Sequence, residues 1–184
     1  MSRILIVLAE GCEEMEAVIA MDVLRRAGLE TVAAGLEPGV VTASRGTKLC
    51  PDCAWNEADP GAFDMLILPG GMGGAERLCG HEGVLETLRA FDRDGTWIGA
   101  ICAAALVLHR AGILTGKRFT CYPGIEEKMS GVTRSAEPVV VDRHLITSQG
   151  PGTAFEFALR IIAELHSPRK ADEVRRELLL GGAL

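Results

Sequence analysis

Cys102 lies where a short apolar run passes directly into a helical pattern. Residues 96–110 begin as a segment rich in strand formers and continue, with no loop residue, as an alanine- and leucine-rich segment of helical periodicity. The turn at such a joint has to be tight, as in a nucleophile elbow. Unpaired N–H groups and the macrodipole at a helix N-terminus favour negative charge. We therefore expect the Cys102 thiol to lose its proton more easily than a free cysteine and to act as a nucleophile or oxidation site.

Two other turns carry groups that could act at the same place. Residues 69–74 read PGGMGG, and so many glycines let backbone N–H groups approach a ligand closely. A carboxylate could come from the segment after the first apolar run, and the spacing there does not choose among the candidates. The alternative interpretations are a small buried hydrophobe for Cys102 and an acid that complements a helix dipole for the carboxylate. The candidate carboxylates are Glu10, Glu13, Glu14 and Glu16.

The histidines do not supply a base for a nucleophilic cysteine. None is convincingly placed beside Cys102, and each is interpreted as a surface residue, so no Cys–His pair is predicted. These residues are His81, His109, His144 and His166.

The remaining cysteines give no metal or redox site that the sequence can support. Cys50 and Cys53 have the C-x-x-C spacing of a redox pair or half a zinc site, but no second pair is present. Cys121 precedes Tyr122 near the expected site, without an assignable partner. The sequence therefore predicts no metal and no cofactor.

Composition narrows the class of protein. The chain has 184 residues, 48% of them hydrophobic, and a formal net charge of −6, which is typical of one soluble domain and gives no reason to expect nucleic acid or an anionic membrane as a partner. No export signal or membrane-length apolar run is recognisable. The cysteines are therefore expected to be reduced thiols in a cytoplasmic protein.

Apolar runs alternate with helical patterns along the chain. This alternation predicts a single α/β domain over residues 1–184, with a doubly wound, mainly parallel sheet and helices on both faces. In such folds ligands bind beyond the carboxyl ends of the strands. The expected strands are 3–9, 29–35, 63–68, the run before Cys102 and 118–122, with a hairpin at 40–50 and a hairpin or two edge strands at 139–148. The expected helices are 13–27, 75–79, 82–94, 102–111, 125–129, 154–165 and 168–180.

Four motifs, in order, resemble the DJ-one/ThiJ/PfpI superfamily over nearly the whole chain. The resemblance is closest to the Parkinson-disease-protein branch and to bacterial YajL-like members. It implies a flavodoxin-like fold and a homodimer, with Cys102 as a reactive, easily oxidised nucleophile and Glu16 as a largely protonated carboxyl group bonded to its sulfur. The motifs are Glu13-Glu14-Met15-Glu16, Leu68-Pro69-Gly70-Gly71, Ala100-Ile101-Cys102-Ala103 and Thr147-Ser148-Gln149-Gly150-Pro151-Gly152-Thr153.

The resemblance also implies roles around this pair. The backbone of Gly70, Gly71 and Ala103 matches a pocket for an oxyanion. Four further positions match accessory residues: Arg45 and Arg26 as basic groups near the site, and Gly150 and Pro151 as a loop that reaches it across the dimer. Cys50 matches a family cysteine near the dimer interface.

One position departs from many relatives. Tyr122 stands before Pro123 where they carry a histidine. A phenol, with an ordinary pKa near 10, is a poor general base at neutral pH, so peptidase or amidase chemistry based on a Cys–His pair is not expected.

Two functions follow as hypotheses. In the first, the protein is an enzyme of the family's glyoxalase or deglycase type, which acts on small dicarbonyls or their adducts through Cys102 and uses Glu16 to move a proton. In the second, it is a stress sensor or chaperone that works through oxidation of Cys102 to a sulfinate.

Overall fold

The computed structural model describes residues 2–181 and contains one seven-stranded sheet in the order β5-β2-β1-β6-β7-β9-β8. All neighbouring strands are parallel except the β8–β9 pair. The central order β2-β1-β6-β7-β9 is the flavodoxin-like order, and β1 and β6 are neighbours at its switch point. The strands of this sheet are β1 Arg3–Leu8, β2 Glu30–Gly35, β5 Cys53–Ala54, β6 Met65–Leu68, β7 Trp97–Ile101, β8 Val139–Asp142 and β9 Leu145–Ser148.

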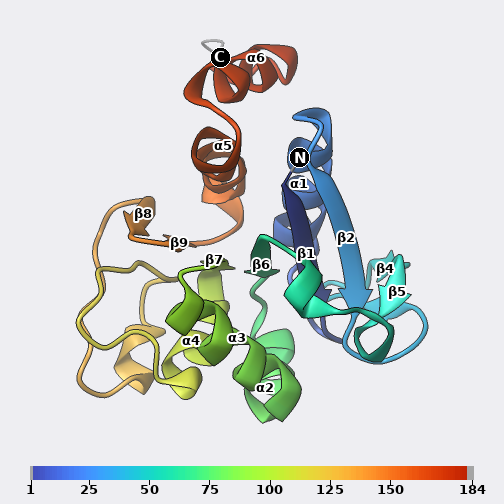
Figure 1. Cartoon of the computed structure of the whole chain (residues 1–184). Helices are drawn as coiled ribbons and strands as arrows, with labels where there is room; N and C mark the ends of the chain where they lie inside the picture. The colour runs from blue at the N-terminus through green and yellow to red at the C-terminus, as the bar shows by residue number, and fades with distance from the viewer. Residues whose placement is uncertain (1, 182–184) are drawn as a thin grey trace.

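Helices cover both faces of the sheet (Figure 1). Because side chains alternate along a strand, Leu5 and Val7 of β1 face one core, while Ile4, Ile6 and Leu8 face the other. The first core lies against α2, α3 and α4, and the second against α1, α5 and α6. The helices are α1 Glu14–Arg26, α2 Met72–Gly80, α3 Glu82–Asp94, α4 Ala105–Ala111, α5 Ala154–Leu165 and α6 Pro168–Glu177.

Most predicted elements are present with small changes at their ends. The hairpin expected within 40–50 is formed by β3 Val41–Thr42 and β4 Lys48–Leu49, and that within 139–148 by β8 and β9. The short helix expected at 125–129 is a 3-10 turn, Glu126–Lys128. No described helix has the length and apolar character needed to cross a bilayer.

The strand predicted at 118–122 is wrong. This segment runs beside the sheet without joining its ladder, because several of its N–H groups bond elsewhere. The N–H of Arg118 donates to the Asp142 carboxylate, and that of Thr120 to the Thr147 hydroxyl. The N–H of Tyr122 donates to the carbonyl oxygen of Cys102 at 3.4 Å. The composition of this segment is thus typical of a strand, but the segment does not form one.

On α1, two large apolar side chains are exposed while a carboxyl group is buried. Met15 and Val18 are 53% and 44% exposed, whereas Glu16 is 1% exposed. Glu16, Ala17 and Ala20 lie on the buried side together with Val23. The helix is rotated so that a carboxyl group, rather than the two larger apolar side chains, faces inward.

Candidate active site

Cys102 follows β7 in a left-handed backbone conformation, with φ of 62°. Residues Cys102–Ala104 form a 3-10 turn, and α4 continues from Ala105. A non-glycine residue in this region carries strain of about 1–3 kcal/mol, which persists only where the surrounding structure maintains it, and such strain concentrates at functional sites. The tight joint expected from the sequence is therefore present.

The glycines after β6 let two neighbouring loops approach Cys102 closely. A Cβ on Gly70 would lie 2.6 Å from the Cys102 Cβ and 2.8 Å from Glu16 Oε2. A Cβ on Gly71, where φ is 82°, would lie 2.5 Å from the carbonyl oxygen of Gly11. Real Cβ atoms essentially never come so close, so both positions require glycine.

Glu16 is the candidate carboxylate that the structure brings to Cys102. Its Oε2 accepts a hydrogen bond from the Gly70 N–H at 2.7 Å. Its Oε1 is buried and has no hydrogen-bond partner among residues 2–181. The other three candidates bond away from this place: Glu10 accepts from the Thr42 N–H, Glu13 caps α1 through the Met15 N–H, and Glu14 accepts from the Ser44 hydroxyl and the Arg45 N–H.

The carboxyl group and the thiol perturb each other. Burial raises the pKa of Glu16 to about 7, against the opposing effects of hydrogen bonds from the Gly70 N–H and the Cys102 thiol. Burial and the charge of Glu16 raise the pKa of Cys102 to about 12, although the backbone N–H groups of Gly71 and Ala103 lower it. The sequence-based expectation of a more acidic thiol is therefore wrong beside an ionised Glu16.

The reason is that this small, dry space tolerates one negative charge more readily than two. When Glu16 keeps its proton, the charge that opposes a thiolate is absent, and the carboxyl group has a proton to donate. A neutral Glu16 is therefore the state in which Cys102 can carry negative charge, with the Gly71 and Ala103 N–H groups beside it.

Gly150 and Tyr122 lie next to this pair within the same chain. A Cβ on Gly150 would lie 3.2 Å from Tyr122 Cδ2 and 4.0 Å from Glu16 Oε1. Pro151 follows Gly150 and opens a 3-10 turn. Within one chain, Gly150 therefore lies beside its own Glu16, and the contribution of this loop across a dimer stays a prediction.

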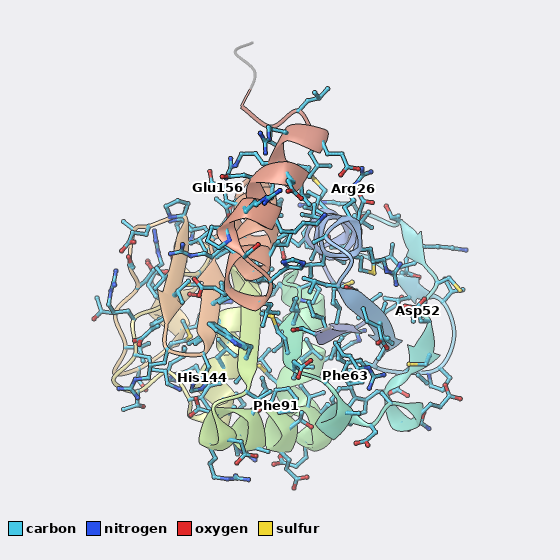
Figure 2. All side chains as sticks on the ribbon, turned by 45° about the horizontal axis from the view of Figure 1, so that its top comes forward. Arg26, Asp52, Phe63, Phe91, His144 and Glu156 are labelled. Atoms are coloured by element: carbon cyan, nitrogen blue, oxygen red, sulfur yellow. The ribbon has the colours of Figure 1, made fainter. Side chains whose placement is uncertain are left out.

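The two arginines expected near Cys102, Arg26 and Arg45, lie in different places. Arg26, labelled in Figure 2, ends α1 and donates hydrogen bonds to Asp22 and to Glu177 of α6. It lies ten residues beyond Glu16, about 15 Å along the helix axis, so within one chain it is away from Glu16 and Cys102. Arg45 lies in the β3–β4 turn, where its N–H donates to Glu14.

Glu14 is a residue whose role the sequence did not indicate. Its carboxylate accepts from the Ser44 hydroxyl and the Arg45 and Thr47 N–H groups, at 3.0 to 3.4 Å. These hydrogen bonds, opposed by burial, lower its pKa to about 2. It thereby fastens the β3–β4 turn to the start of α1. No local signal could reveal this, because its partners lie about thirty residues further on.

The histidines remain away from Cys102, but two are not simple surface residues. His81 caps α3 by accepting from the Val84 N–H, and its ring meets the edge of Trp55. His144 is 15% exposed and bonds to Asp92, which also pairs with Lys117 (Figure 2 labels His144). These structural roles leave neither residue as a base for the thiol.

The other cysteines form no second site. Cys50 and Cys53 are free thiols, and Cys53 lies in β5 at the sheet edge rather than at the start of a helix. Cys121 is buried, and burial together with Glu126 raises its pKa to about 12. Within residues 2–181, no group of three or more histidine, cysteine, aspartate or glutamate side chains could hold a metal ion.

The chain has a flavodoxin-like sheet, and a cysteine at a strained strand-to-helix turn lies against a buried carboxyl group. These features together define the class of protein. Residues 2–164 match the DJ-1/PfpI family. The chain belongs to that family, as its motifs indicated.

Two relatives and one solved structure match this chain over almost their full length. Protein dj-1beta of Drosophila melanogaster is 42% identical over 179 residues, which is 96% of each chain. Glutathione-independent glyoxalase DJR-1.2 of Caenorhabditis elegans is 36% identical over 181 residues, 97% of this chain and 96% of that protein. The structure of oxidized Toxoplasma gondii DJ-1 has a TM-score of 0.94 at 34% identity and covers 99% of this chain and 100% of that one. The YajL-like placement within the family stays a prediction.

The raised pKa of Glu16 predicts how stability depends on pH. Its folded-state pKa of about 7 exceeds the ordinary value of 4.5, so the folded protein binds more protons than the unfolded chain between these values. The stability that Glu16 contributes through this bound proton is fully present below pH 4.5 and is lost as the pH rises through 7. Glu16→Gln removes the titration, so between pH 4 and pH 8 the variant should gain about 3 kcal/mol of unfolding free energy relative to wild type.

Denaturant unfolding of both proteins at several pH values measures this difference. A difference between variant and wild type that does not change with pH would show that Glu16 is not buried beside Cys102 as described.

Proposed function

We propose that this protein is a cofactor-independent enzyme that converts small 2-oxoaldehydes such as methylglyoxal to 2-hydroxy acids, with Cys102 as nucleophile and Glu16 as proton shuttle. The observation that carries the proposal is the Glu16 carboxyl group. One of its oxygens, Oε2, accepts from the Gly70 N–H next to Cys102, while the other, Oε1, is buried without a hydrogen-bond partner among the described residues. The activity named for the Caenorhabditis elegans relative supports the same reaction type.

The first step forms a hemithioacetal. The Cys102 sulfur adds to the aldehyde carbon, and the thiol proton passes through Glu16 to the aldehyde oxygen. The N–H groups of Gly71 and Ala103, which already lower the pKa of the thiol, stabilise negative charge as it develops. Addition needs no external oxidant, because the C–S and O–H bonds that form replace the S–H bond and the π bond of the aldehyde.

The next steps move hydrogen within the substrate. Glu16 as carboxylate removes the hydrogen from the carbon that now bears sulfur, and the electron pair moves onto the neighbouring ketone oxygen to give an enediolate. The protonated Glu16 then returns this proton to the former ketone carbon, while the hydroxyl proton of the sulfur-bearing carbon passes to the neighbouring oxygen, which yields a thioester. Water hydrolyses the thioester to lactate and the free thiol. A carboxyl group with a pKa of about 7 is suited to both directions of transfer near neutral pH.

The same addition suits glycated adducts of proteins or nucleotides, which is the deglycase form of the proposal. Peptide hydrolysis is not proposed, because Tyr122 stands at the position of the family's usual histidine and no described histidine lies at Cys102.

Turnover by single-residue variants tests the proposed mechanism. Cys102→Ser should abolish formation of lactate from methylglyoxal, and Glu16→Gln should lower kcat by at least about 100-fold, the scale of a lost proton-transfer group. Lactate appearance measured in purified protein is the readout, and Cys50→Ser, which changes an exposed thiol, is the matched control. Full turnover in Cys102→Ser would make the proposal wrong.

A second candidate function rests on the same groups, which stabilise negative charge at Cys102. Two backbone N–H groups and a buried acid beside Cys102 could stabilise a sulfinate as well as an oxyanion. In this role the protein would sense oxidants, or act as a chaperone, with a peroxide as the oxidant.

Intact mass after mild hydrogen peroxide tests this role. Wild type should gain about 32 Da, for two oxygen atoms, and Cys102→Ser should not. Glu16→Gln should accumulate less of the two-oxygen species, because an amide hydrogen bond replaces that of the neutral acid. The same gain in Cys102→Ser would assign the oxidation to another cysteine.

We further propose that the protein works as a homodimer in the cytoplasm. Met15 and Val18 support the dimer, because they form an exposed apolar pair one turn apart on α1. Val18→Glu should then give a monomer in sedimentation velocity, whereas Val40→Glu, at another exposed valine, should remain a dimer. A monomeric wild-type protein would contradict this part of the proposal.

A further inference from the structure

A small pocket lies beside the candidate active site and has no part in the mechanism above. It has a volume of about 200 Å³ and lies between the segment that carries Tyr122 and the loop after β9. Its lining is an aromatic ring, two prolines and two glycines, together with two polar side chains. These residues are Tyr122, Pro123, Gln149, Gly150, Pro151, Gly152 and Thr153.

The polar side chains of the loop already have partners. The Gln149 amide donates to the carbonyl oxygens of Ala136 and Glu137, at 2.8 and 3.1 Å. The Thr153 hydroxyl bonds to the Ser148 hydroxyl and to the backbone of Gly150. The surface that the loop leaves free for a ligand in this pocket is therefore mainly carbon. An apolar group of the ligand gains the most binding free energy there.

Gly150 connects the pocket to the reacting groups. Gly150 is near both the Tyr122 ring and Glu16 Oε1, since a Cβ at this residue would be 3.2 Å from the ring and 4.0 Å from that oxygen. Glu16 is 1% exposed, and this Oε1 is a buried oxygen without a hydrogen-bond partner among the described residues. A molecule with its carbonyl groups at Glu16 and Cys102 would place an adjoining substituent toward Gly150 and Tyr122.

We propose that this pocket is the subsite for the apolar substituent of the substrate, so that the preferred substrates are 2-oxoaldehydes with an aryl or bulky alkyl group on the ketone carbon. The inference rests on the proposed glyoxalase function and deepens it. Tyr122 and Gly150 are then specificity-determining residues. Tyr122 provides the wall of the subsite, and Gly150 keeps it open.

Gly150 offers a clean way to fill the subsite. Its φ of 168° and ψ of −168° are extended, so alanine adopts this backbone without strain. The methyl group of Gly150→Ala would press on the Tyr122 ring at the subsite and meet Glu16 Oε1 only at ordinary contact distance. Gly80→Ala is the matched control, because a Cβ at that residue meets nothing within 4 Å and lies outside the pocket.

The kinetic test compares glyoxal, methylglyoxal and phenylglyoxal. Wild type should show the highest kcat/KM for phenylglyoxal. Gly150→Ala should reduce the ratio of phenylglyoxal to glyoxal kcat/KM by about ten-fold, mainly through KM, because a hydrophobic pocket discriminates on this scale. Tyr122→Ala should reduce the same ratio, while Tyr122→Phe and Gly80→Ala should keep it. An equal effect of Gly150→Ala on all three substrates would overturn the subsite.

A binding test does not depend on turnover. Tyr122 is the chain's only tyrosine, so fluorotyrosine labelling gives a single ¹⁹F signal at the pocket. In Cys102→Ala protein, acetophenone should shift this signal, acetone should not, and Gly150→Ala should abolish the shift. No shift with acetophenone would overturn the subsite. A shift in a protein whose wild type turns over none of the oxoaldehydes would keep the apolar pocket and reject the proposed function.

Discussion

The close packing of the Gly70 peptide against two side chains is the constraint on which the site depends. Its N–H holds Glu16, and its α-carbon leaves no room for a side chain between Glu16 and Cys102. The carbonyl oxygen of Gly70 also accepts from the Glu13 N–H, so the same peptide fixes the start of α1. One residue thus sets the distance between acid and thiol, and any larger side chain there would separate them.

The order of the strands in the sheet brings the segments after β1, β6 and β7 close together. β1 and β6 are neighbours at the switch point, so the chain leaving β1 and the chain leaving β6 run side by side before their helices diverge to opposite faces (Figure 1). β7 pairs with β6 from Met65 to Leu68, which brings Ile101 and then Cys102 beside Gly70. The site is therefore a consequence of strand order, and residues more than fifty positions apart meet without a special loop.

The sequence predicted what depends on local pattern and missed what depends on packing. Periodicity and glycine positions located nearly all helices and strands, and the joint at Cys102. The segment 118–122 has strand-like composition, but Thr147 and Asp142 side chains take its N–H groups. Similarly, α1 buries Glu16, which accepts from the Gly70 N–H, and exposes Met15, although both lie in its first turns. The raised pKa of Cys102 arises from burial and from Glu16, which no local motif encodes.

The proton that Glu16 and Cys102 exchange decides which chemistry suits this site. Peptide hydrolysis by a thiolate needs a cation or base that can later protonate an amine, and an imidazole does this well. Here a carboxyl group with a pKa of about 7 takes that place, and Tyr122 lies exposed at the rim. A carboxylic acid can return a proton to carbon or oxygen at neutral pH and can donate to an oxidised sulfur. Both proposed roles draw on the same pair, so formation of a sulfinate at Cys102 would consume the nucleophile and end carbonyl turnover.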